Sequence, residues 1–203
     1  MQELIMEKGC NALVVVAHPD DETIWMGGII LKNPEVNWTI FSVCRSSDSD
    51  RAPKFRKVCE YYNANAIIAD MEDDGILNIK DSVPAIKKII SKNLRVKKFD
   101  HIFTHGQNGE YGHARHKGVH QGVKELFITK KLTANNLIFF NYSKINNKEF
   151  SPLKQKGRST YLFYLSKKEF KKKKQVMADI YGFLADGIDA SYCTNPEAFK
   201  LYK

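Results

Sequence analysis

Short apolar runs alternate with longer amphipathic segments along most of this 203-residue chain. The first run, residues 12–17, reads Ala-Leu-Val-Val-Val-Ala, and such an unbroken β-branched stretch is typical of a strand that is covered on both faces. The segments between the runs carry apolar residues at the spacing of helices. Alternating strands and helices build βαβ units, so the sequence predicts an α/β, Rossmann-like fold with a mostly parallel sheet flanked by helices.

The expected elements follow from this alternation. Strands are expected at residues 12–17, 38–44, 66–69, 101–104, 137–142 and 161–165. Helices are expected at residues 21–32, 52–63, 82–93 and 114–129, and a last helix begins at Ser166, which forms a capping-box pattern with Glu169. Two adjacent glycines in the first helix, Gly27 and Gly28, predict a close approach to the sheet. Residues 145–159 are expected to form a polar loop.

No repeat or Pro/Ser-rich linker divides the sequence, so we expect a single domain over residues 1–203. Ligands bind beyond the carboxyl ends of the strands in a sheet of this kind. That rule selects the loops that begin at Ala17, Arg45, Asp70 and His105.

Composition narrows the functional classes. No apolar stretch approaches the roughly 20 residues that a membrane-spanning helix needs, and the first eleven residues lack a signal-peptide core, so a cytoplasmic location is expected. The four cysteines form no CxxC pair and are expected to be reduced. The net charge of +9 can attract an anionic substrate or a membrane surface, but the lysine-rich run at residues 167–174 is expected to be a solvated helix face. Nucleic acid is not an expected partner.

The first chemical cluster comes directly after the first strand, where residues 17–22 read Ala-His-Pro-Asp-Asp-Glu. Three acidic side chains so close together repel one another, and a divalent cation would offset that repulsion. An aspartate alone in this position could simply cap the next helix. Capping does not explain His18.

The second cluster follows the fourth strand. Four of the six histidines, His105, His113, His116 and His120, fall within sixteen residues that also contain Gly106, Gly109 and Gly112. On a helix, the last three histidines are neighbours at spacings of three and four residues, so a pair of them could face one ion. The two clusters are expected to meet at one edge of the sheet.

These clusters resemble the motifs of the PIG-L/LmbE-like family of zinc-dependent N-acetylglucosaminyl deacetylases. The family's Ala-His-Pro-Asp/Ala-Asp-Glu motif matches residues 17–22, and its Gly-His-x-x-His element matches residues 112–116. The resemblance implies a Zn²⁺ ion held by His18, Asp21 and His116, although other divalent metals would also fit these ligands. It further implies that Asp20 is the general base, that His113 stabilises the oxyanion or protonates the leaving amine, and that zinc-bound water attacks the amide.

Several neighbouring residues have weaker assignments. Glu22 is a candidate to orient a ligand histidine, and His120 is expected to be structural. Family members commonly have Pro-Asp or Pro-Asn where this chain has Ala114-Arg115, so Arg115 could contact an anionic substrate. Loop position makes substrate contacts plausible for Arg51, Asp48 and one of the two residues Asp73 and Asp74.

Three alternatives are weighed against an N-acetyl sugar deacetylase. The first is a metal-dependent amidohydrolase of another acylamine. The second is a basic sugar-binding or nucleic-acid-binding protein with a non-catalytic metal, which would have no need for Asp20. The third, a dinucleotide enzyme, is disfavoured because no G-x-G-x-x-G loop follows the first strand.

Overall fold

The computed structural model describes residues 2–148, 150–184 and 187–203. Its main sheet has eight strands in the order β1-β9-β10-β6-β5-β2-β3-β4. The parallel part consists of β6 (Thr133–Phe140), β5 (Lys98–Thr104), β2 (Asn11–Val16), β3 (Asn37–Cys44) and β4 (Asn65–Met71). The predicted α/β, mostly parallel architecture is therefore confirmed.

An edge of the sheet departs from the parallel pattern. Strand β10 (Glu197–Leu201) runs antiparallel to both β6 and β9 (Tyr161–Phe163), and β1 (Gln2–Glu3) pairs with β9. Part of the expected loop 145–159 is instead ordered as an antiparallel hairpin, in which β7 (Tyr142–Lys144) pairs with β8 (Leu153–Gln155). These pairings were not expected from the sequence.

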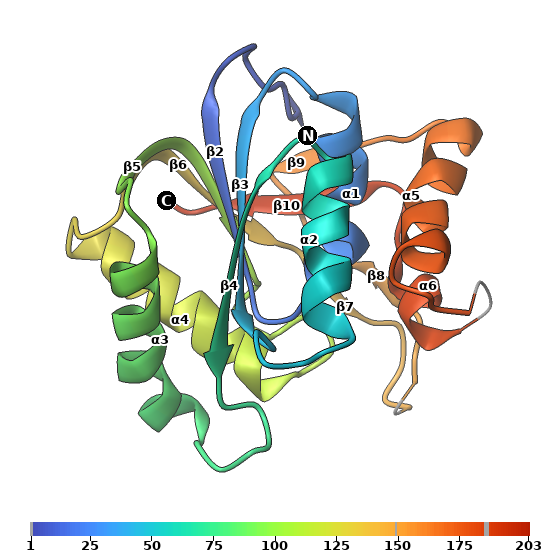
Figure 1. Ribbon diagram of the computed structural model, residues 1–203. Helices are drawn as coiled ribbons and strands as arrows, with labels where there is room; N and C mark the ends of the chain where they lie inside the picture. The colour runs from blue at the N-terminus through green and yellow to red at the C-terminus, as the bar shows by residue number, and fades with distance from the viewer. Residues whose placement is uncertain (1, 149, 185–186) are drawn as a thin grey trace.

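Helices cover both faces of the parallel strands (Figure 1). One face packs against α1 (Asp21–Lys32), α2 (Arg51–Tyr61) and α5 (Lys167–Asp179), and the other against α3 (Ile79–Asn93) and α4 (Ala114–Ile128). In β2, Val14 and Val16 belong to the first core, while Leu13 and Val15 belong to the second. A strand that is buried on both faces reads as a continuous apolar run, which explains the signal in the sequence.

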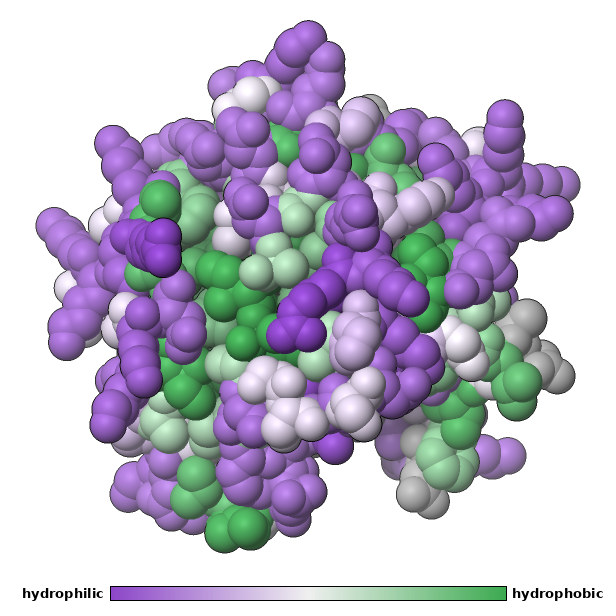
Figure 2. Space-filling model, viewed as in Figure 1, coloured by the Kyte–Doolittle hydropathy of each residue, from purple (hydrophilic) through white to green (hydrophobic). Residues whose placement is uncertain are grey.

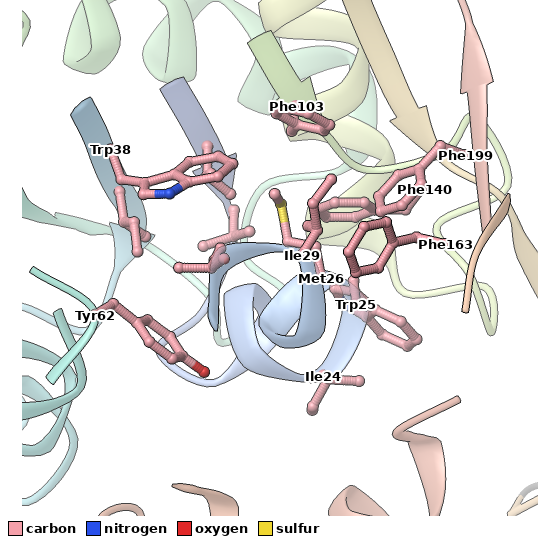
Figure 3. Close-up of a cluster of buried hydrophobic side chains, with 14 of the residues drawn as sticks. Ile24, Trp25, Met26, Ile29, Trp38, Tyr62, Phe103, Phe140, Phe163 and Phe199 are labelled. Carbon is pink, nitrogen blue, oxygen red and sulfur yellow. The ribbon is translucent and has the colours of Figure 1, made fainter. Parts of the chain in front are cut away.

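The aromatic residues concentrate in the core beneath α1 (Figure 3). Trp25 and Met26 of α1 are fully buried there, together with Trp38 of β3 and Phe140 of β6. Because α1 begins directly after the residue 17–22 motif, this packing holds the motif against the sheet. Burial of large aromatic side chains dominates the stability of such a core.

Helix α1 is interrupted in its middle by Met26, whose φ and ψ are −149° and 17°. The interruption frees backbone N–H groups of the next turn, and the buried Glu197 accepts from Gly28 N at 2.7 Å and from Ile29 N at 2.8 Å. A Cβ atom at Gly28 would lie 2.5 Å from the Leu165 side chain and 2.9 Å from Glu197 Oε1 of β10, so the close approach to the sheet occurs at Gly28, whereas Gly27 faces Tyr62, Thr23 and Lys173. Lys173 of α5 completes the arrangement with a 2.7 Å ion pair to Glu197.

Charged residues cover most of the remaining surface. In α5 the lysines at positions 167, 168, 171 and 172 are exposed, as expected for a solvated face, and Figure 2 shows hydrophilic residues over this helix. Lys173, in the same run, is instead fully buried because it pairs with Glu197. The capping box of Ser166 and Glu169 is confirmed. Among the described residues, no helix combines the length and apolar character needed to cross a bilayer.

Candidate active site

The loops that follow β2, β3, β4 and β5 meet at the carboxyl edge of the sheet, as the sequence predicts. They surround a cavity of about 330 Å³. The side chains of His18, Asp20 and Asp21 line it from the start of α1, and His113 lines it from the loop before α4. A short helix near the C-terminus, α6 (Ile188–Tyr192), closes one side of this cavity.

Three potential metal ligands form a nearly regular triangle. His18 Nδ1 lies 3.3 Å from His116 Nε2, and Asp21 Oδ2 lies 3.4 Å from each of these nitrogens. Ligands of a tetrahedral zinc ion at about 2.0–2.1 Å from the metal are separated from one another by about 3.3 Å. The spacing therefore fits an ion of this size, and three protein ligands leave a fourth position open. Ligand atoms also lie within 4.8 Å of one another in two overlapping groups, one of His18, His113 and His116 and the other of Asp21, His105 and His116.

Hydrogen bonds orient both histidines of the triangle. His18 Nε2 donates to Asp73 Oδ2 at 2.9 Å, and His116 Nδ1 donates to Glu110 Oε2 at 2.7 Å, because ionised carboxylates can only accept. When each ring is neutral, the nitrogen that donates to the carboxylate carries the only proton. The lone pairs are then on His18 Nδ1 and His116 Nε2, which are the two nitrogens of the triangle. Carboxylates commonly orient metal-binding histidines in this way.

Glu110 therefore has the role that the sequence suggested for Glu22. Glu110 also bonds His105 Nδ1 at 2.8 Å, and burial would raise its pKa, but the two imidazoles outweigh burial and hold the pKa at about 2. Glu22 contacts no ligand histidine. It accepts instead from Asp20 N at 3.0 Å and from Tyr181 Oη at 2.8 Å, so it supports the backbone of the motif.

Two other histidines of the second cluster, His105 and His120, are buried next to the triangle. His105 is fully buried and its Nε2 accepts from Ala17 N at 2.9 Å, which joins the ends of β5 and β2. His120 donates from Nδ1 to the His105 carbonyl at 2.9 Å. His120 is thus placed in a supporting position one helical turn away, as the sequence predicts.

His113 begins α4 as its N-cap residue. Its Nδ1 accepts from Arg115 N at 3.2 Å, which places the proton of the neutral ring on Nε2. Burial, with further contributions from His116 and His18, lowers the pKa of His113 to about 4. The side chain is therefore a neutral N–H donor at the cavity wall near neutral pH.

Asp20 has an unusual backbone conformation, with φ at 113°, which carries a steric cost for a residue other than glycine. Its carboxylate accepts from Arg51 Nη1 at 2.6 Å. Burial and the neighbouring carboxylate of Asp21 raise the pKa of Asp20 well above its usual range, while Arg51 acts in the opposite direction. Asp20 thus faces the cavity beside the triangle without belonging to it.

The residues expected to contact substrate differ in placement. Arg51 and Asp48 line the cavity, and Asp48 Oδ1 accepts from the Arg51 and Asp50 backbone N–H groups. Arg115 does not line the cavity. The residue is only 3% exposed and its guanidinium donates to Glu72 at 3.0 Å, so the expected contact with an anionic substrate is not supported. The guanidinium instead holds the loop that carries Asp73, as its 3.7 Å approach to Asp73 shows.

Three aromatic side chains, Trp25, Tyr111 and Tyr192, form an aromatic wall of the cavity that was not predicted. Tyr192 of α6 stacks on Tyr111 at 5.2 Å between ring centroids, and Trp25 lies 6.4 Å from Tyr192. Asp189 of α6 also lines the cavity. Tyr111 lies within the second motif region, but no local pattern distinguishes Tyr192 or Asp189 from other C-terminal residues.

The fold and the site define an α/β protein with a cluster of potential His/Asp metal ligands at the carboxyl edge of its sheet, and comparison with known structures supports the fold. The conserved protein TT1542 from Thermus thermophilus has a TM-score of 0.64 at 15% identity, over 94% of both chains. The A40926 pseudoaglycone deacetylase Dbv21 has a TM-score of 0.63 at 14% identity, over 89% of this chain and 84% of its own. The hydratase GalB from Pseudomonas putida KT2440, which acts on 4-carboxy-2-hydroxymuconate, has a TM-score of 0.61 at 16% identity, over 95% of both chains. At such identities the likeness shows a shared fold.

The family follows from the sequence match. Residues 13–127, more than half of the chain, match the PIG-L family, which is described as GlcNAc-PI de-N-acetylase, and the chain belongs to this family. Uncharacterized protein L374 of Acanthamoeba polyphaga mimivirus is 27% identical over 126 residues, or 54% of each protein. The chain therefore aligns with about half the length of that relative.

Proposed function

We propose that this protein is a metal-dependent N-deacetylase that releases acetate from an N-acetylglucosamine-like sugar or sugar conjugate. The observation that carries the proposal is the triangle of His18, Asp21 and His116 with two further groups beside it, Asp20 and His113. Membership of the PIG-L family and the fold shared with the deacetylase Dbv21 support the same reaction class.

In this proposal His18, Asp21 and His116 hold one zinc ion. Two imidazoles and a carboxylate are ligands that zinc accepts, although other divalent metals bind such sets too. The chemistry that zinc supplies in a site of this kind is polarisation of the amide carbonyl and activation of water. Asp73 and Glu110 keep the two rings in orientation for that ion.

Asp20 and His113 divide the proton transfers and the charge stabilisation. The Asp20 carboxylate accepts the proton that the attacking water loses, after Arg51 has shifted away from it or while Arg51 bonds its other oxygen. The neutral Nε2–H of His113 donates to the oxygen that becomes negative as the carbonyl is attacked. Asp20 then passes the proton that it has taken up to the leaving amine, because the neutral His113 ring keeps its one proton for the hydrogen bond to the oxyanion.

The cavity suits an uncharged sugar next to the amide. Among its lining residues are five carboxylates and two arginines, and both arginines are already paired, Arg45 with Asp73 and Arg51 with Asp20. A phosphate group would therefore meet mostly negative charge. Tyr111 and Tyr192 offer ring faces to a pyranose, while the Asp48 and Asp189 carboxylates can accept from its hydroxyl groups.

Metal binding gives the first expected result. Purified protein should contain about one divalent metal ion per chain, and His116→Ala should reduce that content strongly, because it removes one of three protein ligands. Elemental analysis of the two proteins measures the difference. The matched control is His120→Ala, which removes a nearby imidazole outside the triangle and should leave metal content close to wild type. Full retention of metal in the double variant His18→Ala/His116→Ala would contradict the ligand assignment.

The reaction itself gives the second expected result. Incubation with N-acetylglucosamine derivatives should release acetate and a free amine, a chelator should abolish this activity, and added zinc should restore it. Free, phosphorylated, nucleotide-linked and lipid-linked sugars should be compared by acetate assay. If a metal-loaded preparation releases no acetate from any of them, the amide belongs to another class of acylamine.

A further inference from the structure

A second cavity lies on the far side of the loop that follows β5. Its volume is about 880 Å³, and it shares no lining residue with the candidate active site. Its walls are α4, the ends of β6 and β10, and the segment at residues 156–160, while residues 106–108 form its rim. We call this cavity the basic groove.

The charged side chains of the basic groove are all of one sign. Five cationic side chains line it, and none of its lining residues has an acidic side chain; the five are Lys124, Lys156, Arg158, Lys200 and Lys203. Within the described residues, none of them forms an ion pair with an aspartate or glutamate. In the candidate active site, by contrast, Arg45 pairs with Asp73 and Arg51 pairs with Asp20. Several unpaired like charges around one hollow raise the local concentration of anions.

Aromatic side chains supply part of the same groove. Phe139 and Tyr202 are both half-buried, with ring centroids 6.0 Å apart, and His120 packs on Phe139 at 4.5 Å. Burial lowers the pKa of His120, so this ring adds a neutral surface near neutral pH. Lys124 lies 5.7 Å from the Tyr202 ring. Cations interleaved with accessible rings are the combination that binds phosphates together with planar bases.

The segment that carries Lys156 and Arg158 is held in place by a buried side chain. Asn141, which is 6% exposed, donates from Nδ2 to the Lys156 carbonyl and to Ser159 Oγ, both at 2.8 Å. Its own carbonyl accepts from Lys156 N at 2.9 Å. The backbone beneath the two cationic side chains is thus fixed to the end of β6, which reduces the ordering cost of binding a ligand there.

We propose that the basic groove binds a nucleotide, with its phosphates between the cationic side chains and its base against Phe139 and Tyr202. The volume falls within the range of small-molecule sites. A second copy of this chain is a poorer occupant, because a self-complementary contact would bring these cations face to face. This site is separate from the proposed deacetylase site and does not depend on that proposal.

Calorimetric titration with ATP, in the absence of divalent metal and at low salt, tests the proposal. Wild type should bind one ATP per chain, and the affinity should fall as salt is added. The variant Arg158→Glu/Lys200→Glu should bind at least about tenfold more weakly, because it removes two charge-assisted contacts. The variant Lys168→Glu/Lys171→Glu changes the net charge equally on the exposed face of α5, and its affinity should stay within about twofold of wild type.

A second experiment tests whether Tyr202 contacts the base of the nucleotide. Tyr202→Leu should weaken ATP binding about fivefold or more and leave the affinity for inorganic triphosphate unchanged. If a single-stranded oligonucleotide binds to wild type and this binding is lost in the variant Arg158→Glu/Lys200→Glu, the groove binds nucleotides that belong to a nucleic acid strand, which also supports the proposal. The proposal is overturned by absence of saturable ATP binding or by equal loss in the groove and α5 variants. Triphosphate binding as tight as that of ATP overturns the role of the rings.

Discussion

Replacing Asp20 with asparagine should lower turnover by about 10²–10⁴ while metal content remains close to that of wild type. Asparagine keeps the size and one oxygen acceptor of the side chain but cannot take up the proton. It also tolerates positive φ better than most residues do, so the backbone at φ 113° should be preserved. Steady-state acetate release and elemental analysis of the same preparations measure the two effects.

The neighbouring aspartate supplies the matched comparison. Asp21→Asn should lose metal as well as activity, because Oδ2 of Asp21 belongs to the triangle with His18 and His116. Arg51→Lys tests the ion pair to Asp20 separately and should alter the rate less than Asp20→Asn does. If Asp20→Asn loses the metal and Asp21→Asn keeps it, the two roles are reversed.

Glu197→Gln should destabilise the protein by about 3–5 kcal/mol, a large effect for a change far from the cavity. Glu197 and Lys173 are both fully buried, and their 2.7 Å ion pair joins β10 to α5. Removing the negative charge leaves the Lys173 ammonium buried without a counter-ion, with only neutral acceptors, the amide oxygen and the Thr194 carbonyl at 3.4 Å. The amide nitrogen cannot accept, so Gly28 N or Ile29 N loses its acceptor at the interruption of α1. Urea unfolding at neutral pH measures the loss.

A double variant separates the buried charge from the other contacts of Glu197. Lys173→Met/Glu197→Gln should recover part of the stability, because no unpaired ammonium remains. The control Glu169→Gln removes a partly exposed charge from α5, the helix that carries Lys173. It should lower the free energy of unfolding by no more than about 1 kcal/mol. A loss in Glu197→Gln no larger than that in Glu169→Gln would show that the buried pair contributes little.

The parallel half of the fold could be read from the sequence because its signals are local. Strand β2 is buried on both faces and therefore appears as one apolar run, and the predicted bounds of α1 agree with the structure. The capping box at Ser166 needs only residues three positions apart. In contrast, β10 and the β7–β8 hairpin are short strands whose pairing depends on partners that are distant along the chain or close to polar turns.

For the site, the sequence alone determined which residue types could meet. The position of the residue 17–22 motif after one parallel strand, and of the histidines after another, places both clusters at one sheet edge, since the carboxyl ends of parallel strands lie together. The triangle of His18, Asp21 and His116 has the proximity that this reasoning predicts.

Only the tertiary structure decided which side chains form hydrogen bonds and packing contacts around the triangle. Glu110 rather than Glu22 orients His116, Arg115 turns to Glu72 instead of the cavity, and Tyr192 arrives from the C-terminal region to form a wall. These outcomes depend on where side chains distant in sequence find room and hydrogen-bond partners. Motif spacing specifies backbone neighbours along one element, whereas burial and pairing across elements are set when the whole chain packs.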